Sequence, residues 1–312
     1  MNKIEIERAH QRVEPHVHRT PVLTNSFLNE LIGASLYFKA ENFQKVGAFK
    51  ARGAINALSQ LDKSIEHVAT HSSGNHAQAL AWGAKKLGMK ATIVMPKNSP
   101  QVKVDAVKGY GAEIVLCKPT LEARESTLQE VLAKTPGKFI PPYNHEHIIC
   151  GAATAAKELL EDSKDIEAII APVGGGGLLS GTALSSKHFA SSIKVYGAEP
   201  KMADDAQQSF RVGKLIPSVN PNTIADGLKT SLGEINFKVI SKHVEDILTV
   251  TEDEIKEALF LILERMKIVV EPSSAVALAV VLKNKELFNN KKVGLILSGG
   301  NLDLTQLRLW KK

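Results

Sequence analysis

The chain has 312 residues, of which 44% are hydrophobic and 23% are charged, and this ordinary composition excludes a disordered, collagen-like or disulfide-scaffold protein. At about 150 residues per domain, the length predicts two domains with room for a buried core. Lys and Arg number 39 against 33 Asp and Glu, which gives a net charge of +6, but the lysines are scattered rather than clustered. We therefore expect a solvated basic surface and no nucleic-acid partner.

The cysteines and the apolar runs indicate the cellular setting. Cys117 and Cys150 lie in apolar stretches outside any Cys-x-x-Cys pair, which predicts buried free thiols. No stretch approaches the ~18 apolar residues that a membrane span needs. The N-terminal segment MNKIEIERAHQRVEPH is charged and has no apolar signal region. We expect a cytoplasmic protein with no membrane partner.

Strand and helix patterns alternate along the chain. In the first third, a helix is predicted over 5–13, a strand over 36–39 and a helical run over 51–59. Strands then follow over 67–70, 91–96 and 112–116, and helices over 75–88, 100–109 and 121–134. After a break at Pro141-Pro142, the pattern gives helices over 152–162, 178–189 and from 251 onward, and strands over 168–173, 193–197 and 293–297. This alternation is typical of parallel βαβ units and predicts a doubly wound α/β fold.

Four unusual segments follow predicted strands. They are Ser72–His76, Gly174–Gly177, Glu199–Asp205 and Ser298–Asn301. In open α/β sheets, ligands bind beyond the carboxyl ends of the strands. Because the four segments occupy equivalent positions, the sequence predicts that they share one site.

The Gly174–Gly177 segment lies between a predicted strand and a predicted helix. Consecutive glycines let successive backbone N–H groups converge on an anion, and the N-terminus of a helix adds a favourable field. The segment matches neither G-x-G-x-x-G nor the Walker A pattern. We interpret it as a cup for a phosphate monoester rather than only a tight turn.

Two other segments have both a functional and a structural interpretation. Lys50 stands between apolar neighbours, which is typical of a lysine with a lowered pKa that forms Schiff bases, but on its own the pattern favours a surface lysine. The serines of Ser72-Ser73-Gly74-Asn75-His76 either cap a helix or help free N–H groups to hold a carboxylate. On its own, His76 is more typical of an ordinary helix residue than of a base.

Together, these ordered motifs resemble the serine/threonine dehydratase family of fold-type II pyridoxal-phosphate (PLP) enzymes, and most closely its serine racemase branch. The resemblance extends from Thr20-Pro21-Val22-Leu23 to Ser298-Gly299-Gly300-Asn301-Leu302-Asp303. It implies a tryptophan synthase β-like α/β fold with two open, twisted, mostly parallel sheets flanked by helices. It also implies a homodimer, a large PLP-binding domain from residues 1–66 and 146–312, and a small mobile substrate domain from residues 67–145.

The resemblance also implies roles around the cofactor. Lys50 matches the lysine that binds PLP covalently and then removes the Cα proton, and Asn75 matches the partner of the ring hydroxyl. Gly174, Gly175, Gly176 and Gly177, with Leu178, match the phosphate cup, and Ser298 matches the partner of the pyridine nitrogen. A serine does not hold that nitrogen as a firmly charged pyridinium, which suits β-elimination better than transamination.

Substrate contacts follow from the same resemblance. Ser72, Ser73, Asn75 and His76 match the cradle of the substrate carboxylate, and Arg124 matches a substrate-side arginine of the racemase branch. Ser73 also matches a serine on the cofactor face opposite the lysine, where a second proton carrier permits racemisation. The implied activity is deamination of L-serine and L-threonine to a 2-oxo acid and ammonia, with serine racemisation. The alternatives are a threo-3-hydroxyaspartate dehydratase and a dedicated serine racemase.

Two further sites are implied only by the resemblance. Glu199, the carbonyl of Ala203 and Asp205 match an oxygen site for Mg²⁺, Ca²⁺ or Mn²⁺, although such an acidic loop alone would be interpreted as solvated. Some racemase relatives bind ATP at a subunit interface as an activator, and the positions that match its contacts are Glu7, Ser26, Lys45, Gln78, Tyr110, Lys267 and Asn301. Asn25 and Val46 replace hydroxyl residues of that pattern, so the same positions also fit surface or dimer contacts.

Overall fold

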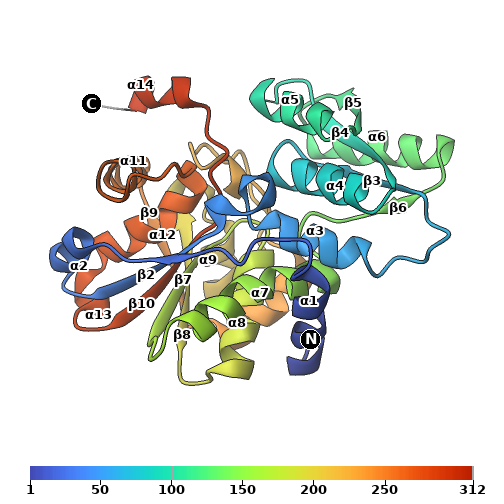
Figure 1. The fold of residues 1–312 in the computed structure, drawn as a ribbon. Coiled ribbons are helices and arrows are strands. Elements are labelled where there is room, and N and C mark those ends of the chain that lie inside the picture. Colours follow the sequence, from blue (N-terminus) through green and yellow to red (C-terminus); the bar gives the residue numbers. More distant parts are fainter. Residues whose placement is uncertain (100, 311–312) are drawn as a thin grey trace.

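Two separate β-sheets organise the computed structural model, which describes residues 1–99 and 101–310 (Figure 1). The larger sheet has the strand order β1-β2-β10-β7-β8-β9, and only β1 runs antiparallel to its neighbour. Its strands are β1 (Val22–Leu23), β2 (Ser35–Ala40), β7 (Ala168–Pro172), β8 (Lys194–Pro200), β9 (Asp246–Val250) and β10 (Lys292–Leu297). The smaller, parallel sheet has the order β5-β4-β3-β6, with β3 (His67–His71), β4 (Lys90–Pro96), β5 (Glu113–Cys117) and β6 (Lys138–Phe139). The predicted α/β class with two mostly parallel sheets is confirmed.

Helices flank both sheets. Those of the smaller sheet are α4 (Asn75–Lys86), α5 (Gln101–Gly109) and α6 (Leu121–Lys134), and Figure 1 shows them gathered at one end of the molecule. The others are α1 (Lys3–Val13), α2 (Ser26–Ile32), α3 (Lys50–Leu58), α7 (Glu146–Asp162), α8 (Gly177–Phe189), α9 (Asp205–Val212), α10 (Glu234–His243), α11 (Glu252–Leu261), α12 (Pro272–Lys283), α13 (Lys285–Phe288) and α14 (Leu307–Trp310). We call the smaller sheet with α4, α5 and α6 the smaller half, and the larger sheet with the other helices the larger half. Helix α3 packs against both α4 and α7, so it lies at the junction of these two halves.

The larger sheet is buried on both faces, as parallel sheets require. Along β7, Ala168 and Ile170 belong to the core cluster that contains side chains of α11 and α12. The alternate residues Ile169 and Ala171 belong to the cluster that contains side chains of α7 and α8. This alternation holds the sheet between two helical layers, so that only the ends of its strands can carry a site.

Several element boundaries differ from the prediction. Helix α7 begins at Glu146 rather than Ala152, because the ring of His145 accepts a hydrogen bond from the His147 N–H and caps the helix there. Strand β8 continues to Pro200, which places Glu199 on a strand rather than in a loop. Elements such as β1, β6, β9, α2, α9 and α10 were not predicted. Pro100, the predicted first residue of a helix, lies outside the described residues.

Within the described residues, no helix combines the length and apolar character needed to span a bilayer. The cytoplasmic location stays a prediction.

Candidate active site

The polar segments that follow β3, β7 and β10 converge at one place. Strands β10, β7 and β8 are parallel neighbours, so their carboxyl ends lie at the same edge of the larger sheet. The smaller half reaches this edge through Asn75, whose Oδ1 accepts a hydrogen bond from Asn301 Nδ2 at 2.9 Å. Asn301 also donates to the Val46 carbonyl oxygen at 2.8 Å, beside the start of α3.

Lys50 is the first residue of α3 and lies within this convergence. Its Nζ donates to the Pro142 carbonyl oxygen at 2.6 Å and lies 5.2 Å and 5.9 Å from the ring centroids of Phe49 and Tyr143. Burial lowers the pKa of Lys50 to about 8, although the nearby Glu271 carboxylate opposes the shift. A neutral amine is therefore accessible near neutral pH, as covalent capture of an aldehyde requires.

The glycine segment leaves a row of unpaired backbone donors at the N-terminus of α8. Within the described residues, the N–H groups of Gly174–Gly177 and Leu178 donate to no protein acceptor. Gly176 has φ +90°, and a Cβ on Gly175 would lie 2.3 Å from the Tyr143 ring, so side chains are excluded here. Five free donors at the positive end of a helix fit the phosphate of PLP.

Ser298 follows β10 and is buried beside Ser274 of α12. The two hydroxyl oxygens lie 3.2 Å apart, and Ser274 Oγ also donates to the Gly299 carbonyl oxygen at 2.6 Å. Because Ser274 gives its one proton to that carbonyl, Ser298 is the donor in the contact between the two hydroxyl groups, and it would turn this proton toward a neutral ring nitrogen when the cofactor binds. The position therefore fits the pyridine nitrogen of PLP without imposing a carboxylate on it.

Glu271 is a site residue that the sequence analysis missed. Its Oε1 accepts from Asn75 Nδ2 at 2.7 Å, whereas its buried Oε2 has no partner within the described residues. Burial, and then the negative charge of Asp226, raise the pKa of Glu271 to about 7. The sequence signal was the dipeptide Glu271-Pro272, because proline is favoured in the first turn of a helix and α12 begins there.

The turn that precedes α4 provides further free donors. The N-cap of α4 is Gly74, with no side-chain cap, so the interpretation of the serines as helix caps is wrong. Ser72 Oγ instead accepts from the Gly74 N–H at 3.3 Å. The N–H groups of Ser73, Asn75 and His76 donate to no acceptor in the part of the chain that the structure describes. These donors at the start of a 12-residue helix suit a carboxylate.

His76 contributes its backbone rather than its ring. The ring Nε2 donates to the Ile140 carbonyl oxygen at 3.1 Å, and the side chain is only 2% exposed. Burial and the nearby positive charge of Lys50 lower the pKa of His76 to about 3. The imidazole is therefore neutral and a weak base, which agrees with an ordinary helix residue.

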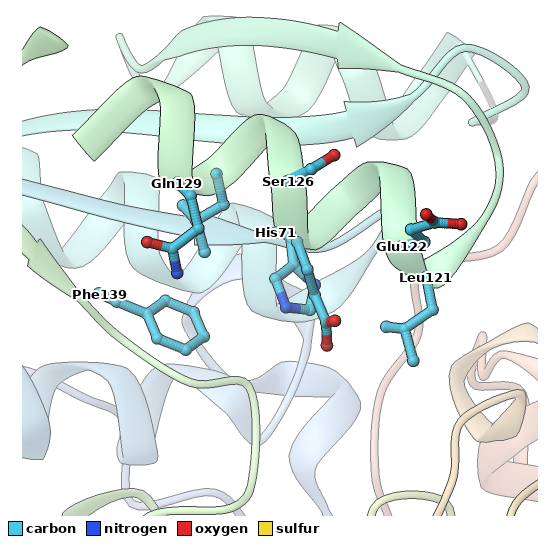
Figure 2. A pocket seen from close by; sticks show the side chains of 8 residues that line it. His71, Leu121, Glu122, Ser126, Gln129 and Phe139 are labelled. Atoms are coloured by element: carbon cyan, nitrogen blue, oxygen red, sulfur yellow. The ribbon is translucent and has the colours of Figure 1, made fainter. Parts of the chain in front are cut away.

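A cavity of about 670 Å³ opens beside the turn, between α6 and the end of β3 (Figure 2). His71 stacks on Phe139 with ring centroids 5.7 Å apart, and Glu122 and Glu125 also line the cavity. Burial and then the positive charge of Arg124 lower the pKa of His71 to about 4. Arg124 is thus close to this cavity, which we call the outer cavity, although within the described residues no hydrogen bond joins Arg124 to the 72–76 turn.

The predicted metal ligands lie at the end of β8. Glu199 accepts from the Ala206 N–H at 3.0 Å and the Gln207 N–H at 2.9 Å, and burial raises its pKa well above the usual range. Burial also raises the pKa of Asp205 to about 6, and its Oδ1 is buried without a partner. No cluster of three His, Cys, Asp or Glu side chains suited to a metal occurs in residues 1–99 and 101–310. The unpaired Asp205 Oδ1 fits a cation site made of the Glu199 and Asp205 carboxylates and the Ala203 carbonyl.

The predicted nucleotide contacts are spread over several elements. Glu7 lies on α1, Ser26 on α2, Lys45 on the 3₁₀ turn η2 (Lys45–Gly47), Gln78 on α4, Tyr110 after α5, Lys267 after the turn η5 (Ile262–Met266), and Asn301 beside Asn75. Gln78 is 3% exposed, whereas Ser26 and Lys267 are exposed. These residues remain a prediction.

Comparisons with known proteins agree with this geometry. A family model described as "Pyridoxal-phosphate dependent enzyme" matches residues 13–299. The chain is 48% identical to the serine racemase of Dictyostelium discoideum, over 97% of this chain and 95% of that protein. It is also 48% identical to the beta-hydroxyaspartate dehydratase of Paracoccus denitrificans, over 96% of each. The crystal structure of a threonine deaminase from T.th. superposes with a TM-score of 0.93 at 40% identity, covering 97% of this chain and 99% of that one.

Proposed function

The chain belongs to the family of pyridoxal-phosphate dependent enzymes, and from that premise we propose that it deaminates L-serine and L-threonine and also racemises serine. The observation that supports this proposal is the position of Lys50, with its lowered pKa, among the unpaired donors of the glycine cup and of the 72–76 turn. The similar proteins include a serine racemase, a beta-hydroxyaspartate dehydratase and a threonine deaminase.

We propose that four groups of residues hold the cofactor. Lys50 would hold the aldehyde carbon of PLP, Asn75 its ring hydroxyl, Gly174–Gly177 with Leu178 its phosphate, and Ser298 its ring nitrogen. Bound PLP would supply an electron sink for the carbanion that forms at Cα of the substrate. The neutral Ser298 hydroxyl moderates this sink, which favours elimination of a β-substituent.

Different residues of the chain bind the substrate and transfer protons. The free N–H groups of the 72–76 turn bind and orient the α-carboxylate. The Lys50 amine takes the Cα proton, and loss of the β-hydroxyl as water followed by hydrolysis gives the 2-oxo acid and ammonia. The Ser73 hydroxyl exchanges a proton with Cα on the opposite face, which converts L-serine to D-serine. We further propose that residues 67–145 move as a small domain and close over the substrate, excluding water from the carbanion.

Product assays test the proposal directly. Holoenzyme with L-serine should give pyruvate and D-serine, and with L-threonine it should give 2-oxobutanoate. Ser73→Ala should abolish formation of D-serine while pyruvate formation persists, because only one face loses its proton carrier. If neither activity changes, the assignment of Ser73 is wrong, and if neither hydroxy-amino acid is consumed, the proposed function is wrong.

The alternative substrate is 3-hydroxyaspartate, and the outer cavity has features for and against it. Arg124 offers a cation for a second carboxylate, whereas Glu122 and Glu125 repel one. We propose that the β-substituent faces the outer cavity, where two acidic side chains against one cation favour the uncharged β-substituents of serine and threonine. The ratio of kcat/KM for L-serine to that for threo-3-hydroxyaspartate, measured by pyruvate and oxaloacetate formation, decides between them.

Three further proposals extend the resemblance. Glu199, the Ala203 carbonyl and Asp205 would hold Mg²⁺, supported by the unpaired Asp205 Oδ1. The chain would form a homodimer, and ATP would bind at its interface as an effector. Sedimentation velocity with and without MgATP, alongside serine deamination under the same conditions, tests the dimer and the nucleotide together.

A further inference from the structure

Lys103 is a buried cation that none of the roles above uses. It lies on α5, is 5% exposed, and forms an ion pair with Asp226 on the turn η4 (Asp226–Leu228). Burial opposes the charge of Lys103, but Asp226 and then Glu271 outweigh burial and raise its pKa. The ammonium therefore stays charged throughout the neutral pH range.

The Lys103 ammonium lies directly beside the turn that we assign to the substrate carboxylate. A Cβ on Gly74 would stand 3.6 Å from Lys103 Nζ. The unpaired N–H groups of Ser73, Asn75 and His76 belong to the same turn. A fixed positive charge next to free donors in a buried site strengthens the binding of an anion.

The ion pair also joins the two halves of the molecule. Helix α5 packs against β5 of the smaller sheet, whereas Leu228, two residues after Asp226, packs into the core of the larger sheet. The same segment lies against the glycine cup, because a Cβ on Gly174 would lie 3.0 Å from Leu228 Cα. Asp226 therefore fixes the ammonium of Lys103 relative to the cup.

We propose that Lys103 is a positioning residue, whose ammonium, anchored by Asp226, holds the 72–76 turn against the larger half and strengthens binding of the substrate α-carboxylate. Lys103 acts through the turn and its N–H groups rather than on the reacting bonds. Its loss therefore weakens binding more than it slows the chemical step. The assignment of the bound group as an amino-acid carboxylate rests on the proposed function.

Steady-state kinetics of the holoenzyme with L-serine test this role. Lys103→Met should raise KM about tenfold or more, as expected for the loss of a charge-assisted contact, with kcat within about threefold of the original value. Lys103→Arg should restore most of the affinity, because it keeps the charge. Asp226→Asn should raise KM by a smaller factor, since it releases the anchor. Lys108→Met, at an exposed position on the same helix, is the matched control and should change neither constant.

Amide hydrogen exchange of the holoenzyme without substrate gives a second readout that does not depend on turnover. The Ser72 and Gly74 amides, which are the hydrogen-bonded N–H groups of the turn, should exchange faster in Lys103→Met and Asp226→Asn, but not in Lys108→Met. Unchanged exchange and KM in both site variants, or a loss confined to kcat, would overturn the proposal. If Lys103→Met does not fold, the KM and exchange rates of Lys103→Arg and Asp226→Asn test the proposal instead. If the original chain consumes no amino acid, the proposed function fails, while the exchange data still decide the role of Lys103.

Discussion

Asn75 donates a hydrogen bond to Glu271 at 2.7 Å, and this bond connects the first residue of α4 to the residue that precedes α12. Helix α4 belongs to the half of the molecule with the smaller sheet, and α12 packs on the larger sheet. The Glu271 carboxylate also acts on the charge of Lys50. A single buried carboxyl group thus links the two halves and influences the central amine of the site.

The reactivity of Lys50 should follow its lowered pKa. Only the neutral amine attacks an aldehyde, so the rate constant for capture of PLP by the apoprotein should rise with pH and level off above a midpoint near 8. The absorbance of the holoenzyme as it forms, followed in a stopped-flow instrument from pH 6 to 10, measures this rate constant. Free N-acetyl-lysine under the same conditions should still gain reactivity at pH 10. A midpoint for the protein as high as that of the free amine would contradict the assignment.

Glu271→Gln should lower the pKa of Lys50 further. Glutamine keeps an oxygen acceptor for Asn75 but removes the negative charge that raises the Lys50 pKa. The midpoint of the capture experiment should therefore move to lower pH than in the original protein. Glu286→Gln, at an exposed position on α13, serves as the control and should leave the midpoint in place. An unchanged or raised midpoint with Glu271→Gln would contradict this effect of the carboxyl group on Lys50.

Replacement of Arg52 should destabilise the fold severely. Arg52 lies on the same helix as Lys50 and is fully buried, and its guanidinium donates to Glu41 at 2.7 Å and to Glu158 at 2.7 Å. Arg52→Met leaves Glu41 buried without its cation, which should reduce the free energy of unfolding by about 3–5 kcal/mol. Urea denaturation of the apoprotein measures the loss. Lys194→Met removes an exposed ion pair and should give no resolvable change, and equal effects of the two variants would refute this account.

Gly175→Ala should weaken cofactor binding. The added Cβ would lie 2.3 Å from the Tyr143 ring, so the ring or the cup must move. Such overpacking costs about 1–3 kcal/mol, which corresponds to roughly five- to 150-fold weaker PLP binding in a fluorescence titration. At Gly109 a Cβ meets nothing within 4 Å, so Gly109→Ala should bind PLP normally. Normal binding by Gly175→Ala would show that the cup does not hold the phosphate.

Magnesium should stabilise the protein through Asp205. A cation that binds only the folded state adds about 2.7 kcal/mol at one hundred times its Kd. Thermal denaturation in Mg²⁺ and in EDTA should therefore give a higher midpoint with the metal. Asp205→Asn should abolish this difference, while Glu257→Gln, at an exposed position, should retain it. A persistent difference in Asp205→Asn would place the cation elsewhere.

The sequence could indicate much of the site because several of its segments carry local signals. The glycines before α8 and the serine turn before α4 follow buried strands, so periodicity alone placed them at strand ends. Lys103 carries no such signal, and the Glu271-Pro272 dipeptide marks only the start of a helix. Their importance comes from contacts with Asn75 and Asp226, which are far away along the chain and meet only in the fold.

The boundaries of some elements could not be predicted from the sequence, for a related physical reason. The start of α7 depends on the ring of His145, which is not among the usual capping residues, so no standard helix-start signal marked it. Strand β9 is only five residues long and contains three half-buried positions, which leaves too short a pattern for recognition. The start of α7 is thus set by an unusual local cap, whereas the extent of β9 is set by its pairing with β8.

The register of β2 has a consequence for biosynthesis. Ser35 pairs with Lys292 and Ala40 with Leu297, so this strand must wait for almost the entire polypeptide to emerge before its neighbour β10 exists. Strands β3, β4 and β5, by contrast, are consecutive both in the chain and in their sheet. Pairings between distant segments form slowly, and nascent chains fold in compact units from the N-terminal side. On the ribosome, we therefore expect the smaller sheet to form first. The edge of β2 that later pairs with β10 stays unpaired until the end of synthesis, and chaperones can bind it during this time.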